Sequence, residues 1–241
     1  MYEQLNGVVL RTISYNDKNA IVRVYTDSRG LLSFLLPQTG GKVARMRRAL
    51  FQPLSLVEIE SDITANREIY RIREARCLVP LPSLHSHPVK NAISLFITEL
   101  LSHVIVEEEQ NAPLFAYISS SVQLLDRLEK GIANFHICFL YNLGIFLGIE
   151  PDTSTYVKGS RFDMLNGVFT TGIPSHSHFL CPEESEALMT LSRMTFSNMH
   201  LFRFNRDQRR RLLDLTIGYY RLHNSAVGEI RSLDILTALF S

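Results

Sequence analysis

Residues 5–13 read LNGVVLRTI, residues 20–26 read AIVRVYT and residues 31–36 read LLSFLL. These runs are short and rich in Val, Ile, Leu, Tyr, Phe and Thr, and several alternate apolar with polar residues, as half-buried strands do. Residues 54–60 (LSLVEIE) and 69–77 (IYRIREARC) continue the pattern, and turn-forming residues separate all five runs. Five short strands in so little chain predict a small closed or half-closed barrel, which leaves few exposed strand edges.

The apolar period changes after residue 80. From residue 91 to residue 106 (NAISLFITELLSHVIV) apolar residues recur every three or four positions, which is typical of an amphipathic helix. Residues 114–128 repeat this pattern. Residues 133–147 are apolar on most faces, which predicts a central buried helix.

The second half of the chain predicts fewer regular elements. Residues 152–182 are rich in Gly and Pro and are expected to be irregular. Pro182 and the acidic residues after it open another helix, because acidic side chains favour the positive end of the helix dipole. A long helix is expected over residues 207–225, and a short helix or extended tail over residues 230–239.

Composition places the chain among ordinary globular proteins. Of its 241 residues, 46% are hydrophobic and 20% are charged, which excludes the disordered and low-complexity classes. The apolar stretch 137–149 is interrupted and falls short of the roughly 20 residues that span a bilayer. The first residues lack the pattern of a secretory signal, so a cytoplasmic location is expected. Three widely spaced cysteines predict no disulfide framework.

Charge is segregated along the chain. Residues 1–80 hold 12 basic and 8 acidic side chains, whereas residues 81–150 hold 3 and 7. A locally positive surface attracts phosphate whatever the rest of the molecule carries. Two basic runs stand out, and for either run alone a plain solvated face is the favoured interpretation. They are Lys42, Arg45, Arg47 and Arg48 in the first segment, and Arg203, Arg206, Arg209, Arg210 and Arg211 in the last.

Two stretches at opposite ends of the chain carry a family resemblance. The opening Gly7-Val-Val-Leu-Arg-Thr, the run 20–26 and the segment 49–60 (ALFQPLSLVEIE) resemble the N-terminal domain of the bacterial recombination mediator family RecO. Tyr219-Tyr-Arg-Leu-His and the later Arg231-Ser-Leu-Asp-Ile-Leu are similar to that family's closing helix and tail. The resemblance implies an α+β protein, with an OB-fold β-barrel at residues 1–80 and a helical domain at residues 83–241.

The same resemblance implies a function. The family binds single- and double-stranded DNA, anneals complementary strands, and with RecR helps to load the recombinase RecA onto DNA that is coated by single-stranded DNA-binding protein. It implies no catalysis of bond making, no cofactor and no membrane partner, and the location would be bacterial, cytoplasmic and nucleoid-associated.

OB-folds bind strands in a groove where cations follow the backbone and aromatic rings stack on bases. We expect DNA contacts from the basic loop, from strand arginines and from the aromatic side chain that lies in a polar loop. These candidates are Lys42, Arg45, Arg47, Arg48, Arg11, Arg23, Arg71 and Tyr15. Arg67 and Arg73 are further strand cations. Tyr25, Phe34 and Tyr70 are further aromatic candidates, and core packing is the favoured interpretation of Tyr25 and Phe34.

The family often carries a zinc module with two Cys-x-x-Cys pairs where this chain has residues 152–182. This sequence departs from that pattern, because only Cys181 lies in the segment. His176, His178 and an aspartate, Asp152 or Asp163, could complete a ligand set, but structural zinc prefers paired thiolates or imidazoles. We therefore expect a metal-free, hydrogen-bonded loop.

Catalytic motifs are absent from the sequence: there is no phosphate-binding Gly-x-x-x-x-Gly-Lys-Ser/Thr loop, no His-Glu-x-x-His and no Gly-x-Ser-x-Gly. His85, His87 and His103 follow no ligand spacing. Three consecutive acids at residues 107–109 could hold a metal as in nucleases, but they point in different directions on a helix. An enzyme is therefore the less favoured class.

A receptor for the acidic tail of single-stranded DNA-binding protein needs an apolar slot flanked by a cation, because that tail ends in an apolar residue with a free carboxylate. The resemblance implies such a slot in the helical domain. The basic candidates on Leu-rich and Phe-rich helices are Arg127, Lys130, Arg206, Arg209 and Arg210. The alternative for the whole protein is an interaction adaptor whose barrel binds protein and not DNA.

Overall fold

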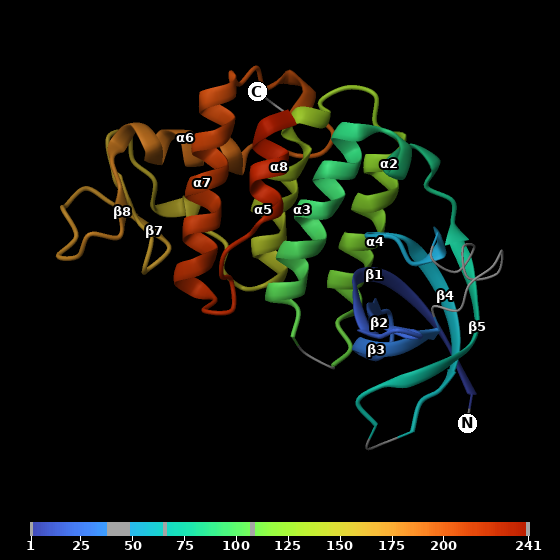
Figure 1. Cartoon of the computed structure of the whole chain (residues 1–241). Coiled ribbons are helices and arrows are strands. Elements are labelled where there is room, and N and C mark those ends of the chain that lie inside the picture. Colours follow the sequence, from blue (N-terminus) through green and yellow to red (C-terminus); the bar gives the residue numbers. More distant parts are fainter. Residues whose placement is uncertain (1, 38–48, 65–66, 107–108, 240–241) are drawn as a thin grey trace. The chain divides into compact units, whose positions relative to one another are not determined.

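Five N-terminal strands close into a barrel in the computed structural model, which describes residues 2–37, 49–64, 67–106 and 109–239 (Figure 1). The strands pair in the order β1-β2-β3-β5-β4, and β1 also pairs with β4. Among the described barrel strands, β3 and β5 pair in parallel and the other neighbours pair antiparallel. The bounds are β1 Tyr2–Asn16, β2 Asn19–Thr26, β3 Gly30–Pro37, β4 Leu56–Asp62 and β5 Tyr70–Val79. The predicted small barrel is therefore confirmed, and it is OB-like.

Strand alternation fills the barrel interior. In β2 the residues Ala20, Val22 and Val24 are buried, while Ile21 and Arg23 between them are partly exposed. The strand expected to begin at residue 54 starts later, since Leu54 has a φ of 59° and its amide donates to the carbonyl of Val9 in β1. A left-handed residue cannot continue a strand, which explains the shift.

The chain divides into two compact units. Unit 1 comprises Met1–Arg127 and Ile230–Leu236, and unit 2 comprises Leu128–Glu229 and Thr237–Ser241. The expected division at residues 80–83 marks the place where strands give way to helices. A separate folding domain at residues 1–80 stays a prediction.

Unit 1 adds helices to the barrel. These are α2 (Pro82–Ser86), which the sequence analysis missed, α3 (Pro88–Val104) and α4 (Ala112–Arg127). Helix α2 contacts both longer helices, and α3 contacts β1. A buried ammonium joins them: Lys90 Nζ donates to the carbonyl of Asp126 at 2.7 Å and to Ser83 Oγ at 2.8 Å. The Asp126 carboxylate accepts from the Leu84 amide at 2.7 Å, so the start of α2 is tied to the end of α4.

The start of the C-terminal helix α8 (Ser232–Leu239) also belongs largely to unit 1. The Glu99 carboxylate of α3 accepts from the amides of Arg231 and Ser232 at 3.0 and 2.8 Å. Burial raises the pKa of Glu99, but these hydrogen bonds outweigh it and the net pKa lies below its usual value. A carboxylate at a helix start is stabilised by the free amides and the helix dipole. The tail is therefore a helix, one of the two forms expected for it.

Unit 2 is built around α5 (Ile132–Phe146), which is buried on most faces as the sequence predicts. The side-chain amide of Asn134 donates to the carbonyls of Met199 and Phe202 at 2.9 and 2.8 Å. The Tyr220 hydroxyl donates to the Leu140 carbonyl at 2.6 Å. The other helices of the unit are α6 (Pro182–Ser192) and α7 (Arg206–His223).

The segment 152–182 is more regular than the sequence predicts. Three short strands, β6 (Arg161–Asp163), β7 (Val168–Thr170) and β8 (Phe179–Leu180), form a sheet in the order β7-β6-β8. Most of the segment lies outside regular elements, and its strands were missed because strands of two or three residues are too short to show a period. Among the residues described, no helix has the length and apolar character that a membrane span requires.

Candidate nucleic-acid interface

The barrel carries an open strand face opposite its core. Arg11 of β1 lies directly across from Arg23 of β2, which lies across from Ser33 of β3. The next row runs across four strands and joins Ile13, Ile21, Leu35 and Arg71. We call the following set the outer strand face: Arg11, Ile13, Tyr15, Ile21, Arg23, Ser33, Leu35 and Arg71.

The rows bring side chains from distant parts of the sequence within reach of one another. Adjacent strands lie about 4.8 Å apart, and successive residues on one face lie about 6.6 Å apart. Like charges that face each other across a strand pair are destabilising, so the opposed Arg11 and Arg23 favour an anion between them. The outer strand face thus combines a cationic row with an apolar row.

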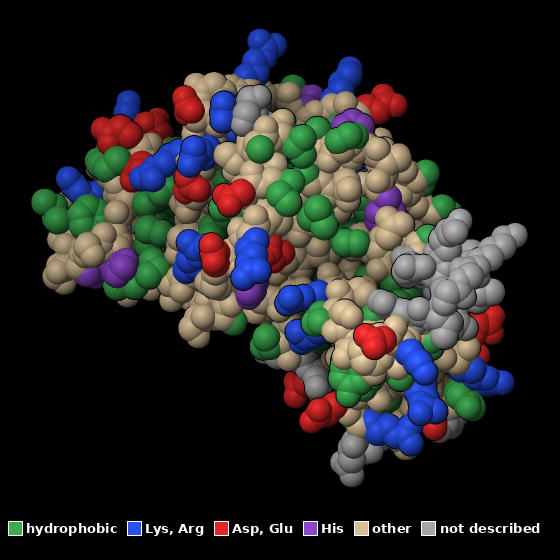
Figure 2. Space-filling model, viewed as in Figure 1, with side chains coloured by type: hydrophobic (Ala, Val, Ile, Leu, Met, Phe, Trp, Pro, Cys, Tyr) green, Lys and Arg blue, Asp and Glu red, His purple; other side chains and the backbone are tan. Residues whose placement is uncertain are grey.

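The arginines of the barrel fall into two groups by their partners. Arg29, Arg73 and Arg76 form ion pairs with Glu3, Glu60 and Glu58, at 2.7, 2.7 and 2.6 Å. In the part of the chain that the structure describes, Arg11, Arg23 and Arg71 form none. Figure 2 shows Lys and Arg side chains on the visible face of the barrel, with acidic side chains among them. Among the described residues, the cations of the outer strand face are therefore available to an incoming phosphate, as are the exposed Lys18 and Arg67.

Two of the paired arginines, Arg73 and Arg76, share strand β5 with Arg71. Arg73 donates to Glu60 and lies 4.4 Å from the centre of the Tyr2 ring, which is consistent with a cation–π contact. Arg73 was one of the strand cations considered for DNA binding, and its carboxylate partner makes it a weaker candidate than Arg71. Arg67 is exposed and lies just before β5.

The aromatic candidates separate by burial. Tyr15 is 60% exposed, as a base-stacking residue must be. The prediction of a polar loop for it is wrong, because it lies near the end of β1 on the outer strand face. Phe34 is inside the barrel core, which confirms the interpretation made for it. Tyr70 is also in that core, 6.2 Å from Phe34 between ring centres, so its candidacy for stacking is wrong. The position of Tyr70 at the start of a strand did not predict from the sequence that its side chain is buried.

Tyr25 is buried for a different reason. It lies on the outside of β2, where Phe115 of α4 covers it at a ring separation of 6.1 Å and the Asn111 carbonyl accepts from its hydroxyl at 3.3 Å. Core packing is confirmed for Tyr25, but against a helix and not inside the barrel. Helix α4 therefore ends the accessible part of this face on the side of Tyr25.

The basic loop cannot be placed beside these residues. Lys42, Arg45, Arg47 and Arg48 lie outside the described residues, so their role in binding DNA stays a prediction from the sequence. The apolar row of the outer strand face was missed by sequence reasoning. Alternation alone showed that Ile13, Ile21 and Leu35 belong to strands, whereas only the register shows that they are neighbours.

The candidates for binding the partner tail do not belong to one unit. Arg127 ends α4 in unit 1, whereas Lys130 and the α7 arginines Arg206, Arg209 and Arg210 belong to unit 2. Arg209 Nη1 donates to the carbonyl of Phe204 at 2.5 Å, so this side chain helps to form the start of α7. Arg127, Lys130 and Arg210 are exposed.

An apolar pocket lies within unit 2, between α5, α7 and the small sheet. Its cavity volume is about 20 Å³, which is little more than one water molecule needs. Tyr141, Ile149, Leu180 and Tyr219 are among its lining residues. The pocket as it stands is too small to receive the apolar end of a peptide tail.

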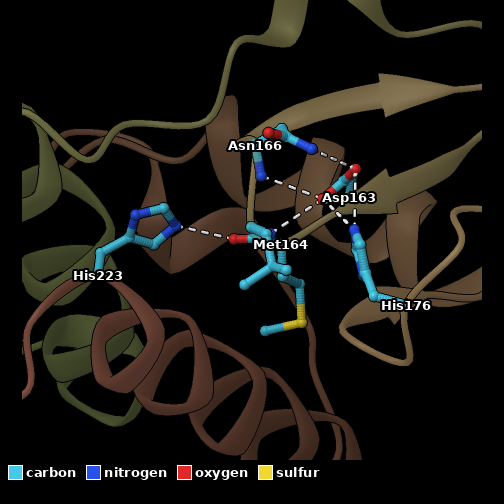
Figure 3. Close-up of polar contacts among 6 residues, drawn as sticks. Asp163, Met164, Asn166, His176 and His223 are labelled. Carbon is cyan, nitrogen blue, oxygen red and sulfur yellow. Dashed lines mark hydrogen bonds and ion pairs between the residues drawn. The ribbon is translucent and has the colours of Figure 1, made fainter.

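The position of the family's zinc module is occupied by a hydrogen-bonded turn (Figure 3). The Asp163 carboxylate accepts from the amides of Leu165 and Asn166, both at 3.0 Å, and from the Asn166 side chain at 2.8 Å. His176 Nε2 lies 3.3 Å from the same carboxylate. Burial raises the pKa of Asp163, but these partners outweigh it and hold the net pKa below its usual value.

The other residues considered as zinc ligands have different roles. Cys181 precedes α6, and its amide donates to Glu184 at 3.4 Å in a capping arrangement. The His178 carbonyl accepts from the Met164 amide at 3.0 Å, and the Met164 carbonyl lies 2.8 Å from His223 Nε2. Within the described ranges no three His, Cys, Asp or Glu side chains gather as a metal site would require.

We therefore predict that the purified protein contains no stoichiometric zinc, because structural zinc needs four closed nitrogen or sulfur ligands. Elemental analysis of protein made without a histidine tag measures this. Cys181→Ser should leave both metal content and thermal stability nearly unchanged, since serine is a good residue at a helix start. One zinc per chain that is lost in Cys181→Ser would contradict the prediction.

The comparisons with known proteins cover both halves of the chain. The family model for the N-terminal part of recombination protein O matches residues 1–80, and that for its C-terminal part matches residues 85–226. The DNA repair protein RecO of Bacteroides fragilis is 42% identical over 241 residues, and that of Phocaeicola vulgatus is 40% identical over 241 residues.

RecO of Flavobacterium psychrophilum is 31% identical over 243 residues. In all three cases the match covers 100% of both chains. The OB-like barrel, the helical region after it and these full-length matches agree with one another. The chain therefore belongs to the RecO family of DNA repair proteins, and its role is in DNA repair and recombination.

Proposed function

We propose that this protein binds single- and double-stranded DNA through the outer strand face and the basic loop, and that it anneals complementary strands. The observation that carries the proposal is the opposed pair Arg11 and Arg23, which has Arg71 in the next row and no carboxylate partner among the described residues. Phosphate groups are the ligands that such a cationic surface fits best. The exposed Tyr15 supplies a ring on which a base can stack.

Annealing on this surface needs no catalytic group. Two strands repel each other through their phosphates, and cationic side chains reduce that repulsion by replacing condensed counterions. Base pairing then supplies the free energy. The protein acts in this proposal as a binding and positioning surface and not as an enzyme, and no cofactor takes part. Because its substrate is chromosomal DNA, we infer a cytoplasmic, nucleoid-associated location.

The test is a salt titration of the full-length chain with a fluorescent oligonucleotide. Each phosphate contact lowers the slope of log affinity against log salt by about 0.7 for a single strand. If the three outer-face arginines and the four loop cations all contact phosphate, we expect a slope of about −5. Absence of binding at low salt would contradict the proposal.

The alternative is an adaptor whose barrel binds protein. One observation favours it, namely that the row Ile13, Ile21 and Leu35 presents apolar side chains on the same face, and Ile13 is 41% exposed. Exposed apolar surface is typical of protein interfaces. The salt titration separates the two functions, since an adaptor would show no steep dependence of single-strand affinity on salt.

We further propose that the protein works with RecR and with single-stranded DNA-binding protein to load RecA, and that the helices hold the receptor for the acidic tail. The exposed cations Arg127, Lys130 and Arg210, with Arg206, support this assignment. A cation that pairs with the terminal carboxylate would make a charge-assisted hydrogen bond, which is stronger than a neutral one.

Removing the tail-binding cation should weaken the tail complex and spare DNA binding. We expect either Arg127→Ala or Arg210→Ala to cost about 1–3 kcal/mol in affinity for an acidic peptide with an apolar C-terminal residue, the range for a hydrogen bond to a charged group. Titration of the full-length variants with that peptide measures it. Lys158→Ala, at another exposed position of unit 2, is the matched control. Equal affinity for a C-terminally amidated peptide would contradict the assignment.

A further inference from the structure

A pocket opens in unit 1 where β4 begins and β5 ends. Its cavity volume is about 260 Å³, which is just below the roughly 300–1,000 Å³ of sites for drug-sized ligands. It therefore fits a single small ring system. Leu56 and Val79 are cross-strand partners in its wall. The described residues that line it are Ala49, Leu50, Ser55, Leu56, Cys77, Val79, Leu81 and His85.

One polar pair stands among these apolar walls. His85 Nε2 of α2 lies 3.3 Å from Ser55 Oγ. Burial lowers the pKa of His85, while the charge of Asp126 opposes this effect, so the imidazole is neutral at neutral pH. If the imidazole donates to serine, the hydroxyl hydrogen is free for a ligand, and if the hydroxyl donates, its lone pairs are free. The pair can therefore offer either a donor or an acceptor.

The lining defines the chemistry of the occupant. None of the eight described lining residues is Lys, Arg, Asp or Glu, so these residues offer no ion-pair partner to a phosphate or a terminal carboxylate. An uncharged planar group with hydrogen-bonding edges and apolar faces suits it better.

We propose that this pocket receives one unstacked nucleobase of a bound single strand, with Leu56 and Val79 against the faces of the base and the Ser55–His85 pair on its edge. The inference rests on the proposed function, because the base reaches the pocket only as part of bound DNA. Since the polar pair switches between donor and acceptor, the site accepts purines and pyrimidines, as a protein that handles any sequence requires.

Cys77 provides a natural reporter for the experiment, because this free thiol lines the pocket and is exposed. Cys138 is buried, and burial raises the pKa of its thiol to about 12, so it reacts slowly. The exposed Cys181 is replaced in a Cys181→Ser background. The rate at which N-ethylmaleimide modifies Cys77 is then measured on the full-length chain, free and with saturating oligonucleotide, while anisotropy reports the fraction of DNA bound.

The two oligonucleotides are oligo-dT and an abasic strand of the same length and charge. We expect oligo-dT to slow Cys77 modification at least tenfold and the abasic strand to leave it nearly unchanged, although both are bound. Equal protection by the two strands, or no protection by bound oligo-dT, would overturn the base pocket and leave the proposed function standing. Absence of binding by either strand would overturn both.

A pocket-filling variant gives an independent measurement. Ala49→Trp places an indole at an exposed position of the pocket wall, and Ala116→Trp places one at an exposed position of α4. We expect Ala49→Trp to weaken oligo-dT binding about tenfold, the scale of one lost base-stacking contact, and to spare the abasic strand. Ala116→Trp should change neither. An unchanged affinity of Ala49→Trp for oligo-dT would overturn the proposal.

Discussion

Replacing Arg11, Arg23 and Arg71 with Ala is expected to lower the affinity for single-stranded DNA about 100-fold at 0.1 M salt and to make the salt slope shallower by about 2. The reason is that these arginines of the outer strand face have no carboxylate partner among the described residues, so each is available to a phosphate. Anisotropy titrations at several salt concentrations measure both quantities.

The barrel offers a matched control for this experiment. Arg29, Arg73 and Arg76 are already paired with carboxylates, so replacing all three removes the same formal charge and few phosphate contacts. We expect less than about a threefold change in affinity from the control, because long-range attraction is screened at this salt concentration. If both triple variants lose affinity equally, binding follows net charge and not the outer strand face.

The second large effect concerns stability in acid. His136 is buried in α5, and burial lowers its pKa to about 3, with the charge of Arg209 acting in the same direction. Above about pH 6.5 the histidine is neutral in both the folded and the unfolded chain. Below that pH the unfolded chain binds a proton that the folded chain does not, so stability falls as the pH decreases from about 6.5 towards 3.

Between pH 7 and pH 5 this one residue should therefore remove about 2 kcal/mol of stability. Urea denaturation at both pH values measures this loss as a change in the free energy of unfolding, taken from the unfolding transition in which α5 unfolds. His136→Gln should show a much smaller difference between the two pH values, whatever its stability at pH 7. The exposed His87→Gln is the control and should keep the difference of the parent. If the stability of the unmodified protein changes between pH 7 and pH 5 by no more than that of His136→Gln, His136 is not a buried neutral histidine.

The pH range in which stability is lost distinguishes the effect of His136 from the effects of the carboxylates. The net pKa values of Asp163 and Glu99 lie below their ordinary values, so their contribution is present above the unfolded carboxylate pKa and is lost as the pH falls through the folded value. Those losses begin below about pH 5. A decrease in stability between pH 7 and pH 5 therefore reports histidine and not these acids.

In our proposals the outer strand face and the base pocket contact different parts of a bound DNA strand. Arg11, Arg23 and Arg71 neutralise phosphates, whereas the pocket beside Leu56 and His85 takes one base out of the stack. An unstacked base and a neutralised backbone both favour the search for a complementary strand. The two surfaces are separable by experiment, because abasic DNA tests only the first.

The local pattern of apolar residues was sufficient to predict most of the strands and helices. The two-residue alternation in residues 20–26 and the three-to-four spacing in residues 91–106 predicted the strand and the helix that the structure contains. Both periods arise from backbone geometry within one element, so neighbouring residues carry the signal. The same locality made β6, β7 and β8 invisible, since no period can develop in two or three residues.

Local sequence also showed which residue types are available for binding: the arginines, the tyrosine Tyr15 and a zinc-module position without its paired thiols. Which of these residues act together depends on the folded arrangement. In the folded chain Arg11 lies opposite Arg23, and Tyr70 is buried in the barrel core. Arg73 forms an ion pair with Glu60, and Ser55 lies within hydrogen-bonding distance of His85. The physical reason is that charge and size belong to a residue, whereas strand register, burial and ion pairing are long-range contacts that exist only once the chain has folded.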